Sequence, residues 1–365
     1  MPGFPFFHDF VVTKNYYIFN QAAVELDTLS ILLGVKSPIE SMSFRRDQSA
    51  KLYLVPRDIT NPSVEVVEVD PHFVFHYANA FEDDDGSIVF DAFRCDELLM
   101  GVSKTPGQAA AGLQSWLTMD YADNVPYPLL TRYTLSSHCD DVAGSVSESV
   151  GKKWSFSKKT LSNACLDFST VNPAVACRRH RFIYASAGSG SSSSGSGSIS
   201  GSISGGPVEQ RSAPLQGLVK VDVDLGIETR WFPEAHQFLG EPCFVPKKKD
   251  PSTISPSTHS SSSVQADIVD DDDDDGYILS YLNDGARKTT EFVIFDAKHI
   301  DRGPISRSPI STYIPFALHG SFADGLVFNF DDVVRRFTAS KALDSKSWNE
   351  MTGGFSGLGL SYGLL

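Results

Sequence analysis

The amino-acid sequence predicts an all-β protein, and two observations support this class. Short segments in which aromatic and β-branched residues alternate with small or polar ones recur along the chain, separated by turn residues. Stretches with the 3.6-residue apolar period of a helix are few. Many short strands with few helices are typical of a sandwich, a barrel or a propeller, and the sequence contains no strict WD-type repeat that would choose among them.

The expected strands are, in order, 51–56, 64–70, 73–81, 87–93, 127–136, 152–161, 180–186, 218–225, 228–232, 241–246, 277–283, 291–297 and 310–316. The third of them, FVFHYANAF, is followed by an acidic turn that ends in glycine. Period-two geometry predicts aromatic side chains on one face of it and a histidine among small residues on the other. The two predicted faces are Phe73, Phe75, Tyr77 and Phe81 against Val74, His76, Ala78 and Ala80.

Two low-complexity segments interrupt the strands. Residues 186–206 are almost pure Ser and Gly, which predicts a flexible coil. Residues 251–275 are rich in Ser and Thr and then acidic, which predicts a solvated loop. We expect both to be surface loops inserted in one β domain over residues 1–330, followed by a Gly-rich tail at 331–365.

The main helical candidate is QAAVELDTLSILLGV, residues 21–35, which has a wide apolar face and few charges. Two interpretations of this face remain open. It either packs in the core or lies on a membrane surface at the entrance for an apolar substrate. The apolar residues concerned are Leu26, Leu29, Ile31, Leu32 and Leu33.

Composition and charge narrow the class of protein. Hydrophobic residues make up 41% and charged residues 21% of the 365 residues, so we expect a globular protein. The formal net charge of −14 argues against non-specific nucleic-acid binding, which needs a basic surface. The 5 cysteines show no C-x-x-C spacing and fit reduced thiols in an intracellular compartment better than a disulfide framework.

The sequence carries no transmembrane or secretory signal. No apolar run reaches the roughly 18 residues that a transmembrane helix needs, and the N-terminus lacks the basic region and cleavage site of a signal peptide. Strand-like sequence begins almost at once, so we expect that the chain is a fragment without its first part. A plastid address would lie in that part, which leaves plastid and cytoplasm open.

The histidines, 9 in number, fall into two groups. We expect ordinary surface or loop roles for those beside charged or turn residues, which are His72, His138, His180, His236, His259 and His299. His8, His76 and His319 are flanked by aromatic and apolar sequence that would bury them. A buried neutral imidazole needs a hydrogen-bond partner or a metal. One such histidine is most often a core residue, but three on separated strands favour an Fe or Zn site.

The segments around these three histidines resemble those of the carotenoid cleavage oxygenase family. FFHDFVVTKNYYIF resembles the family's HDF-x-x-T-x-N-Y segment, and FHYANAFED resembles F-H-x-x-N-A-x-E. GEPCFVPKK resembles EP-x-FVP, DDGYILSYLND with EFVIFDA resembles the DDG-y-l…DA pair, and IPFALHGSF resembles P-x-G-F-H-G-x-F. The matches occur in family order from His8 to about Phe322.

The resemblance implies a seven-bladed β-propeller, here incomplete because the first blades are missing. It also implies a non-haem Fe(II) on the propeller axis, held by four histidines. His8, His76 and His319 correspond to the second, third and fourth ligands, and the first would lie upstream of Met1. Four neutral imidazoles leave the dipositive ion with open positions for O2 and substrate.

Carboxylates beside the ligands are implied as well. Glu241 and Asp167 correspond to residues that accept the second N–H of an imidazole. Asp167 is one methylene shorter than the family's glutamate, so either its histidine is less well oriented or a water bridges the two. Glu82 lies roughly 20 Å along the strand from His76, too far to orient it, and we expect a turn or inter-blade contact there.

The resemblance also assigns apolar residues. Phe75 and Leu318 directly precede two of the ligands and would line the substrate tunnel, with Leu318 in place of the family's aromatic residue. The segment 21–35 falls where the family has a membrane-associating segment. This assigns to the membrane or tunnel entrance Leu29, Ile31, Leu32 and Leu33.

The leading interpretation is an Fe(II)-dependent dioxygenase that cleaves a conjugated C=C bond of a carotenoid or apocarotenoid with O2 to give two carbonyl products. Isomerohydrolase chemistry remains open within the same fold. A second interpretation is a non-catalytic partial propeller that binds apolar ligands or a partner chain, because one histidine ligand is absent. A third, a three-histidine zinc hydrolase, lacks an obvious general base.

Overall fold

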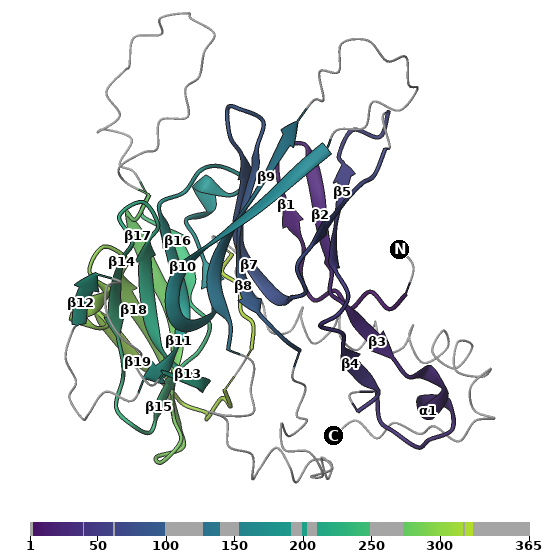
Figure 1. Ribbon diagram of the computed structural model, residues 1–365. Coiled ribbons are helices and arrows are strands. Elements are labelled where there is room, and N and C mark those ends of the chain that lie inside the picture. The colour runs from purple at the N-terminus through teal and green to yellow at the C-terminus, as the bar shows by residue number, and fades with distance from the viewer. Residues whose placement is uncertain are drawn as a thin grey trace, which may run out of the picture. The chain divides into compact units, whose positions relative to one another are not determined.

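The computed structural model describes residues 3–38, 40–60, 63–98, 127–138, 153–190, 199–202, 210–248, 273–316 and 318–323 (Figure 1). The chain divides into two compact units, Met1–Gly320 and Ser321–Leu365. The elements below all belong to the first unit. The expected boundary at residue 330 and the tail at 331–365 lie outside the described residues.

The expected all-β class is confirmed, since strands dominate the described part of the chain (Figure 1). The first sheet has the order β1-β2-β5-β6 and is antiparallel. Its strands are β1 Val11–Val12, β2 Tyr16–Gln21, β5 Ala50–Pro56 and β6 Glu65–Val69. A two-stranded ribbon leaves this sheet between β2 and β5 and carries the helix α1. Its elements are β3 Val24–Leu26, α1 Thr28–Leu32 and β4 Met42–Phe44.

The second sheet has the order β12-β14-β13-β11-β10-β9-β8-β7. The strands are β7 Phe73–Glu82, β8 Ile88–Cys95, β9 Leu129–His138, β10 Lys153–Thr170, β11 Phe182–Gly190, β12 Ile199–Ser202, β13 Gln210–Asp222 and β14 Ile227–Trp231. The long strand β10 changes partner along its length. Residues 153–160 pair with β9, whereas the end from Leu166 pairs with β11. The sheet is therefore two four-stranded groups joined through β10, with β12 added at the edge.

The third sheet has the order β15-β17-β18-β19, and β16 also pairs with β17. The strands are β15 Gln237–Leu239, β16 Cys243–Pro246, β17 Gly276–Asp284, β18 Thr289–Asp296 and β19 Ser306–Ile310. Two short 3-10 turns, η1 Pro173–Val175 and η3 Ile300–Arg302, complete the described elements.

Apolar clusters join each four-stranded group to the next, because alternate residues of a strand face opposite sides. Strand β11 illustrates this alternation. Ile183 packs in a cluster with Phe93 of the preceding group, whereas Tyr184 packs in a cluster with Phe295 of the following sheet. A further cluster joins the first sheet to β7–β9 and includes Leu52. The groups thus stack face to face.

Glu82 provides a polar link between two of these groups, as the sequence predicted. It ends β7, and its carboxylate accepts hydrogen bonds from Thr13 Oγ1 at 2.6 Å and from the backbone N–H of Asn15 at 2.7 Å. Thr13 and Asn15 form the turn between β1 and β2. The contact fastens the first sheet, which follows His8, to the strand that carries His76.

The prediction of a helix over residues 21–35 is wrong. Residue 21 ends β2, and the helix begins only after Asp27, whose carboxylate accepts the Ser30 N–H at 3.1 Å as an N-cap. Gly34, at φ 67°, follows the C-cap residue Leu33. Core packing of this segment is also wrong for Leu29 and Leu32, which are 65% and 83% exposed.

Two further expectations about elements need correction. The last strand lies at 306–310 and not at 310–316, because beyond it the backbone N–H of Ile314 bonds to the side chain of Thr290 instead of a ladder partner. The Ser/Gly segment is a strand at 186–190 and at Ile199–Ser202. Backbone groups pair whatever the side chain, and β12 adds to the free edge of β14. The other residues of 191–206 lie outside the described residues.

The loop expected at 251–275 is described only from Asp273 onwards, and Asp273 is buried there, not solvated. Its carboxylate accepts the backbone N–H groups of Arg181 and Phe182. A carboxylate of this acidic segment therefore accepts the backbone N–H groups at the start of β11. A count of charges along the sequence does not reveal this contact.

Strand β7 departs from simple alternation. Its pairing with β8 shifts register between Val74 and Tyr77, and again before Asn79. Each shift adds a residue to β7 and rotates the side chains that follow. Val74 and Tyr77 therefore pack in the same cluster, although the sequence predicted opposite faces for them. The first bulge contains His76.

Candidate metal centre

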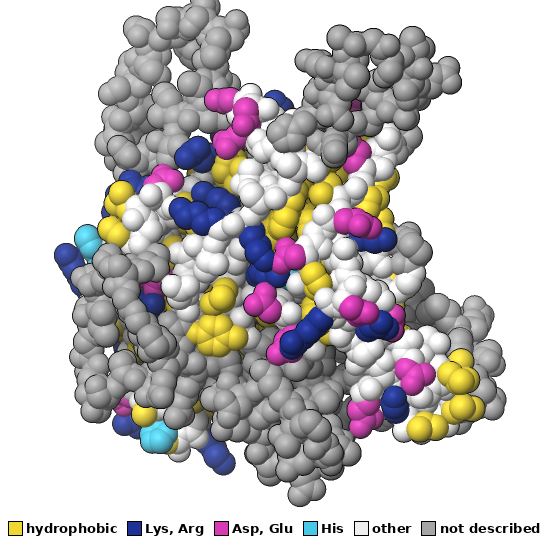
Figure 2. All heavy atoms as spheres, viewed as in Figure 1, with side chains coloured by type: hydrophobic (Ala, Val, Ile, Leu, Met, Phe, Trp, Pro, Cys, Tyr) yellow, Lys and Arg dark blue, Asp and Glu magenta, His cyan; other side chains and the backbone are white. Residues whose placement is uncertain are grey.

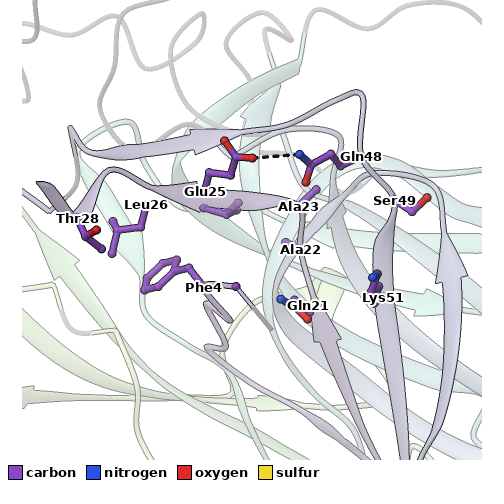
Figure 3. Close-up of a pocket in the computed structure, with 12 residues that line it drawn as sticks. Phe4, Gln21, Ala22, Ala23, Glu25, Leu26, Thr28, Gln48, Ser49 and Lys51 are labelled. Atoms are coloured by element: carbon purple, nitrogen blue, oxygen red, sulfur yellow. Dashed lines mark hydrogen bonds between the residues drawn. The ribbon is translucent and has the colours of Figure 1, made fainter. Parts of the chain in front are cut away.

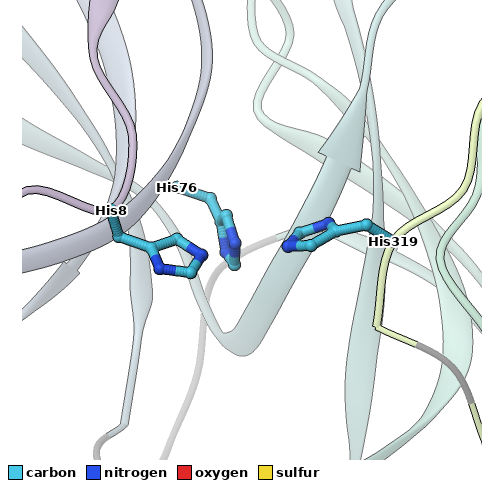
Figure 4. A group of neighbouring side chains, drawn as sticks. All are labelled: His8, His76 and His319. Atoms are coloured by element: carbon cyan, nitrogen blue, oxygen red, sulfur yellow. The ribbon is translucent and has the colours of Figure 1, made fainter. Parts of the chain in front are cut away.

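Three histidines from distant parts of the sequence converge at one place. His8 precedes β1, His76 lies in β7 and His319 follows β19. One ligand nitrogen from each lies within 4.8 Å of those of the other two, and the rings point toward one another (Figure 4). The ring centroids of His8 and His76 are 4.9 Å apart, and those of His76 and His319 are 5.1 Å apart. The structure brings together all three predicted metal ligands.

The expectation that apolar neighbours would bury these histidines holds only in part. The His76 side chain is 14% exposed, but His319 is 50% exposed and His8 is also exposed. The imidazoles face a cavity of about 290 Å³, which is also lined by Asp9, Phe168 and Glu241. Leu318, the apolar neighbour of His319, is itself 63% exposed and does not bury that imidazole.

Asp167 orients His76. Its Oδ1 lies 2.8 Å from Nδ1 of the imidazole, so the shorter side chain makes direct contact and no bridging water is needed. The opposite nitrogen of His76, Nε2, is buried without a hydrogen-bond partner among the described residues. Burial alone lowers the pKa of His76, but the hydrogen bond and negative charge of Asp167 outweigh it and raise this pKa.

Glu241 has the same relation to His319. Its Oε1 lies 3.1 Å from Nδ1 of His319, and its Oε2 accepts the backbone N–H of Gly320 at 2.7 Å. Glu241 lies two residues before β16, so the third sheet places its carboxylate beside His319. The carboxylate thus fixes both the imidazole and the backbone beside it.

His8 is placed by its neighbour Asp9. The Asp9 carboxylate accepts the backbone N–H of Phe10 at 2.7 Å and that of Tyr77, inside the bulge of β7, at 3.1 Å. This bond fixes the His8 segment next to His76. Partial burial lowers the pKa of His8, and the neighbouring imidazoles of His76 and His319 lower it further.

Asp9 and Phe168 are among the residues of this site that sequence reasoning missed. Asp9 could have been noticed from its place beside a proposed ligand in the HDF motif. Phe168 could not, because no expected strand contained it and its left-handed backbone leaves no mark in the sequence. Its ring centroid is 4.8 Å from that of His76 and 5.4 Å from that of His319.

The two predicted tunnel residues have different positions. The Phe75 ring contacts His8, with the centroids 5.5 Å apart. Leu318 is 63% exposed and does not line the histidine cavity. A chain of ring contacts leads away from the site, because Phe75 contacts Phe73, Phe73 contacts Phe6, and Phe6 contacts Phe4.

A larger cavity of about 570 Å³ lies at the base of the β3–β4 ribbon (Figure 3). Phe4, Leu26, Glu25 and Lys51 are among the residues that line it, and Glu25 accepts a hydrogen bond from Gln48 at 3.0 Å. None of the described residues that line it is a histidine or a cysteine. The smaller cavity is therefore the site with metal-binding chemistry, and Phe4 connects the two through the ring contacts.

The predicted membrane residues lie at the end of the β3–β4 ribbon. Leu29, Leu32 and Leu33 are 65%, 83% and 68% exposed, and Val35, at 70%, joins them. We call these four residues the leucine patch. Figure 2 shows hydrophobic side chains gathered over this end of the ribbon. Ile31 is half-buried and does not belong to the patch. Among the described residues, no helix is long and apolar enough to cross a membrane.

The surface or loop role expected for the other histidines holds in part for His72 and His180. Both lie in loops just before strands, but each is buried, at 1% exposed. His180 Nε2 lies 2.9 Å from the buried carboxylate of Asp91. The expectation holds for His236 and His299, which are exposed. The side chain of His138 and the whole of His259 lie outside the described residues.

The three histidines fit a transition-metal ion. Two nitrogens bonded to one ion at about 2.1 Å each can be at most about 4.2 Å apart, so small side-chain rotations suffice from the present spacing. The buried, unpartnered Nε2 of His76 is a further sign of a ligand. Carboxylate partners on Nδ1 are the usual support of metal-binding imidazoles. Three neutral imidazoles suit Fe, Zn or Cu.

The chain was compared with known proteins. It is 30% identical over 322 residues to the apocarotenoid-15,15'-oxygenase of Synechocystis sp. This alignment covers 88% of this chain and 52% of that protein. It is 21% identical over 325 residues to a carotenoid 9,10(9',10')-cleavage dioxygenase of Crocus sativus, with 89% and 49% covered. The crystal structure of cobalt-substituted Synechocystis ACO superposes with a TM-score of 0.65 at 29% identity, over 88% of this chain and 54% of that one.

The chain spans about half the length of these relatives. A family profile described as retinal pigment epithelial membrane protein (RPE65) matches residues 1–324. This match covers most of the chain, including all three histidines. The chain therefore belongs to the retinal pigment epithelial membrane protein family, and the predicted relationship to the carotenoid cleavage oxygenases is confirmed.

Proposed function

We propose that this chain forms part of an Fe(II)-dependent dioxygenase that cleaves a conjugated C=C bond of a carotenoid or apocarotenoid with O2 to give two carbonyl products. The observation that carries the proposal is the convergence of His8, His76 and His319 on one cavity in a chain of this family. Both oxygen atoms enter the products, so the reaction needs no separate reductant.

The imidazoles would hold the iron through the nitrogens that face the cavity. Asp167 and Glu241 accept the N–H groups of His76 and His319 at Nδ1, which leaves the lone pairs of the opposite nitrogens directed at the cavity. Bound Fe(II) would supply the redox chemistry with O2 beside a double bond. The rings of Phe75 and Phe168 contact the imidazoles and would shield the reacting bond from water.

A lipid-soluble polyene requires an apolar way in. The leucine patch would rest on a membrane surface, with the polar parts of the ribbon in water. The larger cavity reaches Thr28, where α1 begins, and Phe4 on its wall starts the series of ring contacts that ends at His8. These features support peripheral membrane contact and a route from the patch to the histidines.

The arrangement of sheets supports an incomplete seven-bladed propeller as the architecture. Four antiparallel groups of about four strands follow one another along the chain and stack face to face, as blades do. None of the described sheets closes on itself. In this proposal His8, His76 and His319 face the axis from separate blades.

The test is a cleavage assay under isotopically heavy O2. The full chain loaded with Fe(II) is incubated with apocarotenals in detergent, and we expect loss of polyene absorption and one heavy oxygen in each aldehyde or ketone product. His76→Ala should abolish cleavage, whereas His236→Ala, at an exposed histidine outside the site, should retain it. Iron-loaded chain that binds the polyene without cleaving it would contradict the proposal and favour a non-catalytic binding protein.

A further inference from the structure

Phe168 interrupts β10 in a backbone conformation that bulky residues rarely adopt. Its φ is 51°, in the left-handed region. Across the sheet, Asp167 pairs with Ser186 and Ser169 pairs with Ala185, so Phe168 is the extra residue of a β-bulge. Strain of this kind persists where the surroundings enforce it, and it clusters at functional sites.

The bulge closes on the carboxylate of Asp167. The backbone N–H of Phe168 donates to Asp167 Oδ1 at 2.9 Å, and the same oxygen lies 2.8 Å from Nδ1 of His76. Asp167 is 8% exposed, so water does not compete strongly for this oxygen. The backbone of β10 and the imidazole from β7 therefore fix the carboxylate together. A short aspartate side chain follows its backbone closely, so the bulge decides where the carboxylate stands.

We propose that Phe168 is a positioning residue whose left-handed backbone sets Asp167 so that His76 carries its proton on Nδ1 and turns Nε2 to the cavity. The effect belongs to the backbone of Phe168 and not to its ring, although the ring lies near the imidazoles. The inference rests on the proposed metal site for its functional meaning. The tautomer of His76, however, can be measured without metal.

Substitutions that remove the ring distinguish the effect of the backbone conformation from the effect of the side chain. Asn and Gly tolerate the left-handed region, whereas β-branched Val does not. Phe168→Asn and Phe168→Val form the matched pair, since the two new side chains are similar in size. Phe168→Gly excludes a hydrogen bond from the new side chain as the cause. Nitrogen NMR of the histidine side chains, recorded on the metal-free full chain at alkaline pH, reports the tautomer of His76.

We expect the Nδ1–H tautomer in the wild type, Phe168→Asn and Phe168→Gly, and its loss or mixing in Phe168→Val. Retention of this tautomer in the Val variant, or its loss in both Asn and Gly variants, would overturn the inference. If the Val variant does not fold, Phe168→Thr takes its place, because threonine is also β-branched.

Metal binding adds a second readout, with Co(II) as the probe. The Val variant should bind Co(II) about 10- to 100-fold more weakly than the Gly variant, the usual effect of a displaced partner of a ligand. Equal affinities in these two variants would also overturn the inference. A wild-type chain that binds no Co(II) would count against the proposed metal site instead, and the tautomers would then decide the role of Phe168 alone.

Discussion

His76 and Asp167 are separated by 91 residues in the sequence, yet Nδ1 of the one lies 2.8 Å from Oδ1 of the other. The pair joins β7 to the far end of β10. It gives the most buried of the three imidazoles a fixed orientation, and Nε2 of His76 has no hydrogen-bond partner in the described part of the chain. The predictions below start from this relationship and extend to the framework around it.

Asp167→Asn should weaken Co(II) binding by about 10- to 100-fold, because an amide oxygen is a weaker acceptor than a carboxylate and holds the imidazole less firmly. Titration followed by Co(II) absorption measures the affinity. Asp84→Asn, at an exposed position in the β7–β8 turn, is the control and should bind as the wild type does. Equal affinity of the Asp167 variant and the control would show that Asp167 does not support the ligand.

The free energy of unfolding should decrease in mild acid because His72 is buried. Burial lowers its pKa to about 4, and the charge of Arg94 contributes. In the unfolded chain His72 binds a proton near pH 6.5, so between pH 6.5 and pH 4 the unfolded state gains protons that the folded state does not. The free energy of unfolding should therefore decrease over this window by roughly 3 kcal/mol from this group.

The variant His72→Gln isolates this contribution. Chemical denaturation of both proteins across the window gives the difference between their free energies of unfolding. Carboxylates titrate alike in the two, so the advantage of the wild type should shrink as the pH falls toward 4. Parallel pH profiles would mean that His72 does not titrate differently on folding.

Asp91→Asn should destabilise the fold by about 3–5 kcal/mol, as expected when one partner of a buried ion pair is removed. Asp91 is fully buried, and its two oxygens accept hydrogen bonds from Arg132 at 2.8 and 2.7 Å. Urea denaturation measures the change, with Asp84→Asn as the surface control. A loss below about 1 kcal/mol, the scale of an exposed pair, would contradict this role.

Replacing Leu29, Leu32 and Leu33 with serine should release the chain from liposomes in a flotation assay, because the variant lacks the apolar surface that would enter the interface. Melting temperature should change little, since these side chains are largely exposed. Ile59→Ser is the matched control, at an apolar residue that is 89% exposed outside the patch. Unchanged flotation of the triple variant would reject membrane contact through the leucine patch.

The sequence predicted the strands well where aromatic and β-branched residues are dense, as in β5, β8 and β17. It failed at residues 21–35, because a run of leucines has the same appearance whether it packs in the core or lies exposed on a ribbon. The bulges in β7 and β10 also leave no signal in the sequence, because neither contains a glycine. Strand pairing, which depends on distant residues, decides these features.

The candidate site was predictable in its chemistry but not in its exposure. His8, His76 and His319 were identified from their neighbours, and their convergence follows from the fold. Burial was misjudged for His72, which packs inward beside charged residues, and for His319, which is half exposed. Both residues lie outside the strands, where flanking sequence does not fix the side to which a side chain turns.

The most direct test of the account is the stoichiometry of metal binding. The full chain, freed of metal and titrated with Co(II), should bind one ion, detected by elemental analysis and by the absorption of Co(II) with nitrogen ligands. His8→Ala, His76→Ala and His319→Ala should each abolish this binding, whereas His236→Ala should retain it. A wild-type chain that binds no Co(II), or three histidine variants that bind it as tightly as the wild type, would contradict the central claim.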